Sequence, residues 1–301
     1  MSSVSVLPQA ERISFERPVR RGIRSNPAVR QFLANKMAVV ALIFFVVLSI
    51  VAWQAPRIAP YDPGKVNLLH KLESPSWDHW IGTDQFGRDV WSRIVWGARL
   101  TFFYAFIAVG LAMGVGTLLG AIAGYARGWV DAAIMRLTDI MLAFPGLLLA
   151  LVVLTLLGPG LRNAEVAVGV SLIPVYVRLV RGTMLSVRER EHVLAARVTG
   201  CNPAQLLWRH ILSNVWSQVI ILSTTALGWS IVIAATLNFL GLGVKPPTAE
   251  WGADLASGRQ WLSVGWWVST GPGVAITIVI LAVNYLGDGL TEAFDPGLRK
   301  R

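Results

Sequence analysis

Four histidines are the residues of this sequence best suited to bind a metal ion or to transfer protons. They are His70, His79, His192 and His210. His70 lies three residues from Glu73, and His192 lies three residues from Glu189, so each pair supplies two ligands and has no third close by in the sequence. The spacing therefore predicts no metal site and no metal-dependent hydrolysis.

Nucleotide hydrolysis and proton coupling also leave recognisable patterns. The sequence contains no phosphate-binding GxxxxGK[ST] segment, since the turns GPGLRN and GLGVKPP lack the required Lys followed by a hydroxyl residue. The acidic residues in or beside apolar stretches are Asp139, Glu165, Asp288 and Glu292, and each lies near the end of its stretch, where water can solvate it. We therefore expect a non-catalytic chain that binds no cofactor itself.

The composition indicates a polytopic membrane protein. Of the 301 residues, 54% are hydrophobic and 15% charged, and the mean hydropathy is +0.56. A helix needs about 20 mostly apolar residues to cross a bilayer. Six stretches have roughly this length, at about 37–55, 101–124, 134–157, 164–182, 214–240 and 272–291. The expected fold is all-α with six transmembrane helices.

The charges indicate an orientation and a division of the chain. A basic leader precedes the first stretch and shows no cleavage site, so that stretch should stay as a helix with the N-terminus inside. Basic residues on the cytoplasmic side then explain the net charge of +10, and no nucleic-acid partner is needed to account for it. The predicted parts are a cytoplasmic segment 1–36, a helix 37–55, an outer loop 56–100, a five-helix core 101–291 and a cytoplasmic tail 292–301.

A polar insert at 186–213 interrupts the apolar pattern of the core. Ser186 and Glu189 have the spacing of a capping box, which predicts a helix from about Val187. Gly200 is placed to end that helix in a left-handed conformation. Asn202 is placed to cap a second helix, with Pro203 at its first position.

The small side chains of this insert would let another protein approach closely. Ala195, Ala196 and Gly200 supply them, which suits a docking element. The alternative is a pair of amphipathic helices in the lipid headgroup layer, to which Arg188 and Arg197 would contribute. The physical pattern alone leaves both possibilities open.

The insert resembles the cytoplasmic EAA loop of binding-protein-dependent ABC importer permeases. The resemblance rests on REHVLAARVTGCNPAQLLWRHILSN, in which Ala195, Ala196, Gly200 and Leu212 match the family pattern. Leu194, His210 and Ser213 depart from the Glu, Ile and Pro that are usual there. The resemblance implies that this loop couples the chain to an ATPase through residues Glu191, Ala195, Ala196, Gly200, Asn202, Pro203 and Leu212.

Other segments resemble the second permease subunit of the dipeptide, oligopeptide and nickel subfamily. These are HWIGTDQFGRDVWSRIVWGARLT, FLGLGVKPPTAEWGADL and WWVSTGPGVAITIVILAVNYLGDGLTEAFDPGLRK. The resemblance implies the type I ABC importer permease fold in a bacterial or archaeal cytoplasmic membrane, with both termini cytoplasmic. It also implies a heterodimer with a second permease, two ATPases that bind ATP and Mg²⁺, and an extracytoplasmic substrate-binding protein. Peptides, glutathione, opines and nickel all remain possible substrates.

Polar residues in two apolar stretches are candidates for a translocation path. Ser223, Ser230 and Asn238 lie close to one face of the stretch 214–240, and Asn284 lies in the final stretch. Hydrogen bonding between helices is the alternative role. Glycines at four-residue spacing predict close helix contacts, at Gly110 and Gly114 and at Gly116, Gly120 and Gly124.

Two outer segments are candidates for receptor contact. Asp84 with Arg88, and Asp89 with Arg93, have the spacing of ion pairs on a helix. The segment 241–271 contains Pro247 and Trp251 among several tryptophans and is expected to lie along the outer leaflet. Fixing of the loop and membrane anchoring are the alternative roles.

A self-sufficient channel or secondary carrier is the alternative function. Such proteins often contain interrupted helices, and Pro145-Gly146 and Pro174 could interrupt the stretches 134–157 and 164–182. A scaffold without transport activity is a third possibility.

Overall fold

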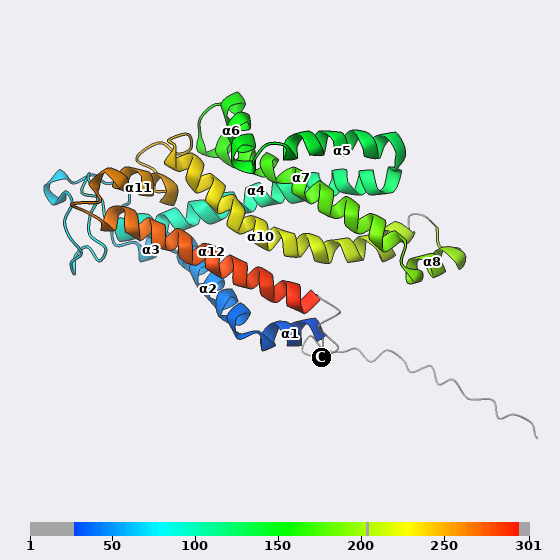
Figure 1. The fold of residues 1–301 in the computed structure, drawn as a ribbon. Coiled ribbons are helices and arrows are strands. Elements are labelled where there is room, and N and C mark those ends of the chain that lie inside the picture. Colours follow the sequence, from blue (N-terminus) through cyan, green and yellow to red (C-terminus); the bar gives the residue numbers. More distant parts are fainter. Residues whose placement is uncertain (1–26, 203–204, 295–301) are drawn as a thin grey trace, which may run out of the picture.

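The computed structural model describes residues 27–202 and 205–294, and this part of the chain is helical (Figure 1). The segments 1–26 and 295–301 of the expected cytoplasmic leader and tail, and Pro203 of the insert, lie outside the described residues. The α-helices are α1 (Pro27–Ala34), α2 (Lys36–Trp53), α3 (Ala55–Ile58), α4 (Val90–Ala126), α5 (Gly128–Leu142), α6 (Gly146–Leu157), α7 (Leu161–Arg188), α8 (Glu191–Val198), α10 (Leu212–Phe239), α11 (Trp251–Gly258) and α12 (Trp267–Phe294). Short helical turns are η2 (Leu68–His70), η3 (Leu206–Ile211) and η4 (Arg259–Trp261).

Five helices are long and apolar enough to cross a membrane, namely α2, α4, α7, α10 and α12. The pair α5 and α6 gives a sixth crossing only if its two halves, bent by 97°, form one span. The all-α fold is therefore confirmed, but the continuous helix expected over 134–157 is wrong. Pro145 provides the physical reason, because proline lacks a backbone N–H and disfavours helical backbone at the residue before it. Pro174, in contrast, lies inside the unbroken helix α7.

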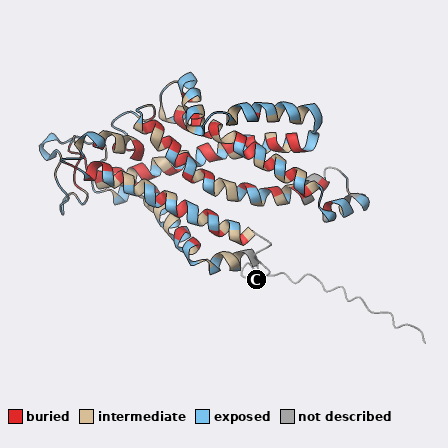
Figure 2. Ribbon diagram, in the orientation of Figure 1, coloured by how far each residue is buried: buried red, intermediate tan, exposed pale blue. Residues whose placement is uncertain are grey.

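The most extensive contact between two helices in the described part of the bundle joins α4 to α7. A Cβ atom added to Gly116 would lie 2.4 Å from Cβ of Tyr176, and one added to Gly120 would lie 2.7 Å from the Val177 carbonyl oxygen. Gly110 and Gly114 have nothing within 4 Å of the corresponding position. The predicted close contact is thus confirmed for one group of glycines and is wrong for the other within this subunit. Figure 2 shows buried residues concentrated along the central helices and exposed residues on α5 and α8.

The N-terminal helices pack on the last helix of the chain. The Asn35 side chain caps α2 by accepting a hydrogen bond from the Ala38 N–H at 3.0 Å. Its amide nitrogen donates to a carboxylate oxygen of Glu292 in α12 at 2.8 Å. This contact holds the junction of α1 and α2 against the end of α12.

The insert and the loops that are expected to face outward lie at opposite ends of the bundle (Figure 1). We call the end that holds these loops the outer end, after that expectation. The loop 59–89, η2 and α11 gather at one end, while α8 lies at the other end beyond the start of α10. The long helices of the bundle connect these two ends.

Candidate functional site

The insert begins with a break after α7 and not with a new capped helix. Helix α7 continues to Arg188, so the helix start expected at Val187 is wrong. Ser186 and Glu189 lie in the last turn of α7, where the Glu189 N–H donates to the Ser186 carbonyl. Helix α8 starts at Glu191, and the carbonyl of Arg190 accepts from the N–H groups of Val193 and Leu194.

The two local signals at the end of α8 are confirmed. Gly200 has φ +88°, and the Cys201 N–H donates to the Ala196 carbonyl at 3.1 Å, as in a left-handed helix end. Asn202 accepts a hydrogen bond from the Gln205 N–H at 2.7 Å through its side-chain oxygen. The following turn η3 is a π-helix that runs directly into α10, with no break at Leu212 or Ser213.

One side of the insert packs on the bundle. Val193, Leu206 and Ile211 are buried in a cluster that includes Met184 and Val187 of α7. Apolar side chains thus join the insert to two long helices, α7 and α10.

The other side of the insert is exposed and partly apolar. We call it the elbow face and define it as Glu191, Leu194, Ala195, Val198 and Gly200. Val198 is 88% exposed, and Leu194 is 44% exposed. Exposed apolar side chains grouped on a polar insert are typical of a surface that another protein covers.

The structure does not join the four polar candidates into one path. Ser230 is fully buried and donates to the carbonyl of Leu227, and Asn238 is buried and accepts from the Val244 N–H at 2.8 Å. Ser223 is half-buried and accepts from the Tyr176 hydroxyl at 3.0 Å, whereas Asn284 is exposed. In this structure Ser230 and Asn238 therefore lie inside the subunit and do not face its surface.

The bend between α5 and α6 leaves a groove of about 460 Å³ against α7 and α10. Phe144, Leu172, Trp229 and Val232 are among its apolar lining residues, and Ser171, Thr225 and Thr236 are among its polar ones. Within the described chain, no Asp, Glu, Lys, Arg or His side chain lines this groove. It lacks the charged groups with which a proton-coupled carrier binds its coupling ion.

At the outer end, one of the two expected ion pairs forms. The Arg88 Nε donates to Asp84 at 2.6 Å, and both side chains are buried. Asp89 instead caps α4 by accepting from the Ser92 N–H at 2.7 Å, so its expected pairing with Arg93 is wrong. Spacing along a helix could not reveal this, because Asp89 precedes the first turn.

Arg93 pairs with Asp254 in α11, a residue that sequence analysis missed. The guanidinium donates to Asp254 through Nε at 3.0 Å and also through one terminal nitrogen. It further donates to the carbonyls of Pro63 at 2.7 Å, Pro247 at 3.1 Å and Thr248 at 3.2 Å. One buried cation thus holds α4, α11 and two loops together.

This packing corrects the expected receptor-facing set. Asp84, Arg88, Asp89 and Trp251 are buried, so they cannot contact a docked protein directly; Pro247 is exposed. Trp251 donates to the Ile94 carbonyl at 2.9 Å. Within the segment 241–271, Trp251 is thus part of the core of the outer end, whereas Trp266 is exposed and stays available for the predicted contact with the outer leaflet.

A buried carboxyl group in the same region should make stability depend on pH. Burial raises the pKa of Glu250 to about 7, although hydrogen bonds from the N–H groups of Gly252 and Ala253 oppose the shift. In the unfolded chain this carboxyl has its ordinary pKa, near 4.5. The stability that comes from burying the neutral carboxyl is fully present below this pH and is lost as the pH rises through 7, the pKa in the folded chain. A pKa shift of this size changes the free energy of unfolding by about 3 kcal/mol at most.

We expect Glu250→Gln to flatten the pH dependence of thermal stability between about pH 4.5 and 7.5. The amide keeps an oxygen that can accept from the Ala253 N–H, which now donates to Glu250 at 2.8 Å, but it cannot ionise. Melting temperatures of the purified protein in detergent, measured for both forms across this range, provide the test. Parallel profiles for the two forms would contradict the assignment.

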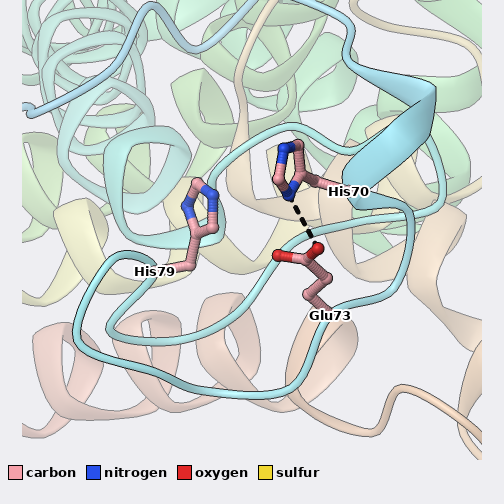
Figure 3. A group of neighbouring side chains, drawn as sticks. All are labelled: His70, Glu73 and His79. Atoms are coloured by element: carbon pink, nitrogen blue, oxygen red, sulfur yellow. Dashed lines mark hydrogen bonds and ion pairs between the residues drawn. The ribbon is translucent and has the colours of Figure 1, made fainter.

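The structure also places a third possible ligand beside the pair His70 and Glu73. Ligand atoms of His70, Glu73 and His79 lie within 4.8 Å of one another (Figure 3). The expectation that this pair has no third ligand nearby is therefore wrong. The loop folds back between residues 73 and 79, and no local spacing pattern signals such a return.

Comparison with known proteins gives matches over most of the chain. The family model described as "Binding-protein-dependent transport system inner membrane component" matches residues 116–300, and "N-terminal TM domain of oligopeptide transport permease C" matches residues 27–75. The dipeptide transport system permease protein DppC of Alkalihalophilus pseudofirmus is 42% identical over 272 residues, which cover 90% of each chain. The glutathione transport system permease protein GsiD of Pectobacterium atrosepticum is 41% identical over 271 residues, again 90% of each chain.

A solved structure supports the same architecture. A chain of the MetNI methionine ABC transporter, in an inward-facing conformation, matches with a TM-score of 0.55 and 18% identity. The match covers 67% of the present chain and 97% of that chain. At this identity the likeness is one of fold, and the fold is that of type I ABC importer permeases.

Proposed function

The chain belongs to the family of binding-protein-dependent transport system inner membrane components, as a permease subunit of an ABC importer, and we propose that it forms one translocation path with a second, different permease subunit. Energy would come from two cytoplasmic ATPase subunits that bind ATP and Mg²⁺. The present chain would bind neither the ATP nor the Mg²⁺ that the ATPases use, and it would catalyse no reaction. An extracytoplasmic binding protein would deliver the substrate to the outer end.

The elbow face is the observation that carries this proposal. It combines exposed apolar side chains with a rigid attachment to α7 and α10 through Val193, Leu206 and Ile211. An ATPase that closes on ATP binding would push on this face, and the long helices would carry the movement across the bilayer as a rigid-body rotation. The departure at Leu194 fits an apolar contact in place of an ionic one.

The proposed orientation places α8 and both termini in the cytoplasm of a bacterial or archaeal cell. The outer loop and α11 then face the binding protein, and Pro247 is an exposed candidate contact there. Of the expected path residues, Ser223 and Asn284 stay candidates, because they are not fully buried.

For the substrate, we propose a dipeptide or another short peptide, a class that includes glutathione. The support is indirect and comes from the relatives, one of which is a dipeptide permease and another a glutathione permease. Nickel and opines are the alternatives within the same family. Purifying the binding protein that associates with the complex and measuring which compounds it binds would decide between these classes.

A self-sufficient carrier is favoured by one observation, the broken pair α5 and α6. The groove beside the break argues against it, because no charged side chain of the described chain lines that groove.

Uptake measurements in proteoliposomes distinguish an ABC importer subunit from a self-sufficient carrier. The chain alone should show no uptake, while the complex with its partners should take up peptide only with ATP inside. ATP-independent uptake by the chain alone would overturn the proposal.

We expect Val198→Asp to reduce co-purification of the ATPase at least tenfold and to abolish uptake. A charge in the middle of an apolar contact must lose its hydration when the partner binds, which is costly without a counter-charge. Val198 is 88% exposed, so the folded chain itself should not be affected.

Val66→Asp is the matched control, because Val66 is 52% exposed at the opposite end of the molecule. It should leave the amount of bound ATPase unchanged. Normal ATPase binding and uptake in Val198→Asp would show that α8 is not the contact.

A further inference from the structure

The outer loop brings two short segments side by side through hydrogen bonds. The Thr83 N–H donates to the Glu73 carbonyl at 3.0 Å, and the Glu73 N–H donates to the Thr83 hydroxyl at 2.9 Å. The Leu72 N–H donates to the Asp84 carbonyl at 3.1 Å. These bonds fix the backbone around Glu73 against the segment that follows His79, so the juxtaposition in Figure 3 is held by the backbone.

His79 is oriented by a buried carboxylate. Its Nδ1 lies 2.9 Å from an oxygen of Asp89, whose side chain is only 2% exposed and also caps α4. An imidazole that donates Nδ1–H to a carboxylate has its Nε2 lone pair free for a metal ion and is a stronger ligand for this reason. The ring also lies against Tyr61 in a tilted arrangement, with ring centres 4.8 Å apart.

The other two groups are accessible and close. His70 Nδ1 lies 2.7 Å from a Glu73 carboxylate oxygen, and these side chains are 49% and 42% exposed. Ligands of a tetrahedral site at about 2.1 Å from the metal lie about 3.4 Å apart, so the observed limit of 4.8 Å needs only rotation of exposed side chains. The three residues line a cavity of about 470 Å³, which also includes Asp62, Asp78 and Lys65.

We propose that His70, Glu73 and His79 bind one divalent transition-metal ion of the Zn²⁺ class at the outer end of the subunit. Two imidazoles and one carboxylate form a donor set that suits Zn²⁺, Co²⁺ or Ni²⁺ better than Ca²⁺ or Mg²⁺. Three protein ligands leave a coordination position for water. The bound ion links η2 and the turn at Glu73 to the start of α4 through His79 and Asp89.

Binding is tested with the full-length chain in detergent, purified through an affinity tag that contains no histidine. We expect one Zn²⁺ per chain by calorimetry and by elemental analysis after gel filtration. Co²⁺ should give the visible absorption of a low-coordinate site, and Zn²⁺ should remove that absorption. No stoichiometric Zn²⁺ binding to the wild-type chain would overturn the proposal.

Variants identify the ligands. His70→Gln and Glu73→Gln change exposed side chains and should each weaken Zn²⁺ binding more than tenfold, while His210→Gln, in the insert at the other end, should leave it unchanged. Asp89→Asn keeps a residue that can cap α4 but removes the carboxylate that orients His79, so it should weaken binding about 10- to 100-fold. Unchanged affinity in His70→Gln and Glu73→Gln would place the metal elsewhere and overturn the assignment.

Discussion

Replacing Asp254 with alanine should lower the free energy of unfolding by about 3–5 kcal/mol, the range typical of a buried ion pair that loses one partner. Arg93 is buried, and Asp254 is its only carboxylate partner among the described residues. Without Asp254 the guanidinium would keep the carbonyls of Pro63, Pro247 and Thr248 but would have no counter-charge. Carbonyl dipoles offset only part of the cost of burying a full charge.

The measurement is denaturant unfolding of the purified chain, followed by tryptophan fluorescence. Trp251 and Trp267, two of the thirteen tryptophans, are buried at the outer end and contribute to this signal. Asp78→Ala is the control, because Asp78 is exposed and should change stability by less than about 0.5 kcal/mol. An equal, small effect of both substitutions would show that the ion pair does not hold the outer end together.

Replacing Gly120 with leucine should separate α4 from α7 and destabilise the chain by about 3 kcal/mol or more. A Cβ at this position would lie 2.7 Å from the Val177 carbonyl oxygen and 2.8 Å from Cβ of Val180. Overpacking of a core usually costs about 1–3 kcal/mol, and the cost is at the upper end here because backbone atoms of α7 cannot rotate away.

Gly114→Leu is the matched control, since the same helix carries the same change at a position with nothing within 4 Å. Both variants are compared with the wild type as purified chains in detergent, by thermal unfolding. We expect a clear loss of stability only for Gly120→Leu. Similar melting temperatures for the two variants would contradict the close contact between α4 and α7.

The sequence predicts the elements of this fold better than their ends. Apolar runs are sufficient to locate the membrane helices, but α4 begins at Val90 and not near residue 101. Its first turns contain the charged residues Arg93 and Arg99, so this part of the helix is not recognisable as an apolar run. Likewise, the proline at 145 signals an interruption but not its angle, which depends on how α6 packs against α7.

Among the site residues, those whose contacts are local in the sequence can be predicted, and those whose partners are distant in the sequence cannot. Gly200 and Asn202 act on backbone groups a few residues away, so their roles can be predicted from sequence. Arg93 and Asp254 are 161 residues apart, and only the folded chain brings them together. Ser186 and Glu189 mislead because their spacing, typical of a helix start, occurs here at a helix end.

The uninterrupted length of α4 has a mechanical consequence. Its 37 residues make a rod of about 55 Å, fixed at the outer end by Arg93 and along its second half by the glycine contacts with α7. Since α7 runs on to the elbow, a tilt of only about 5° begun there would shift the far tip of such a lever by roughly 5 Å. Under the proposed coupling, a small rotation imposed by the ATPase subunits would become a displacement comparable to the width of one amino-acid side chain.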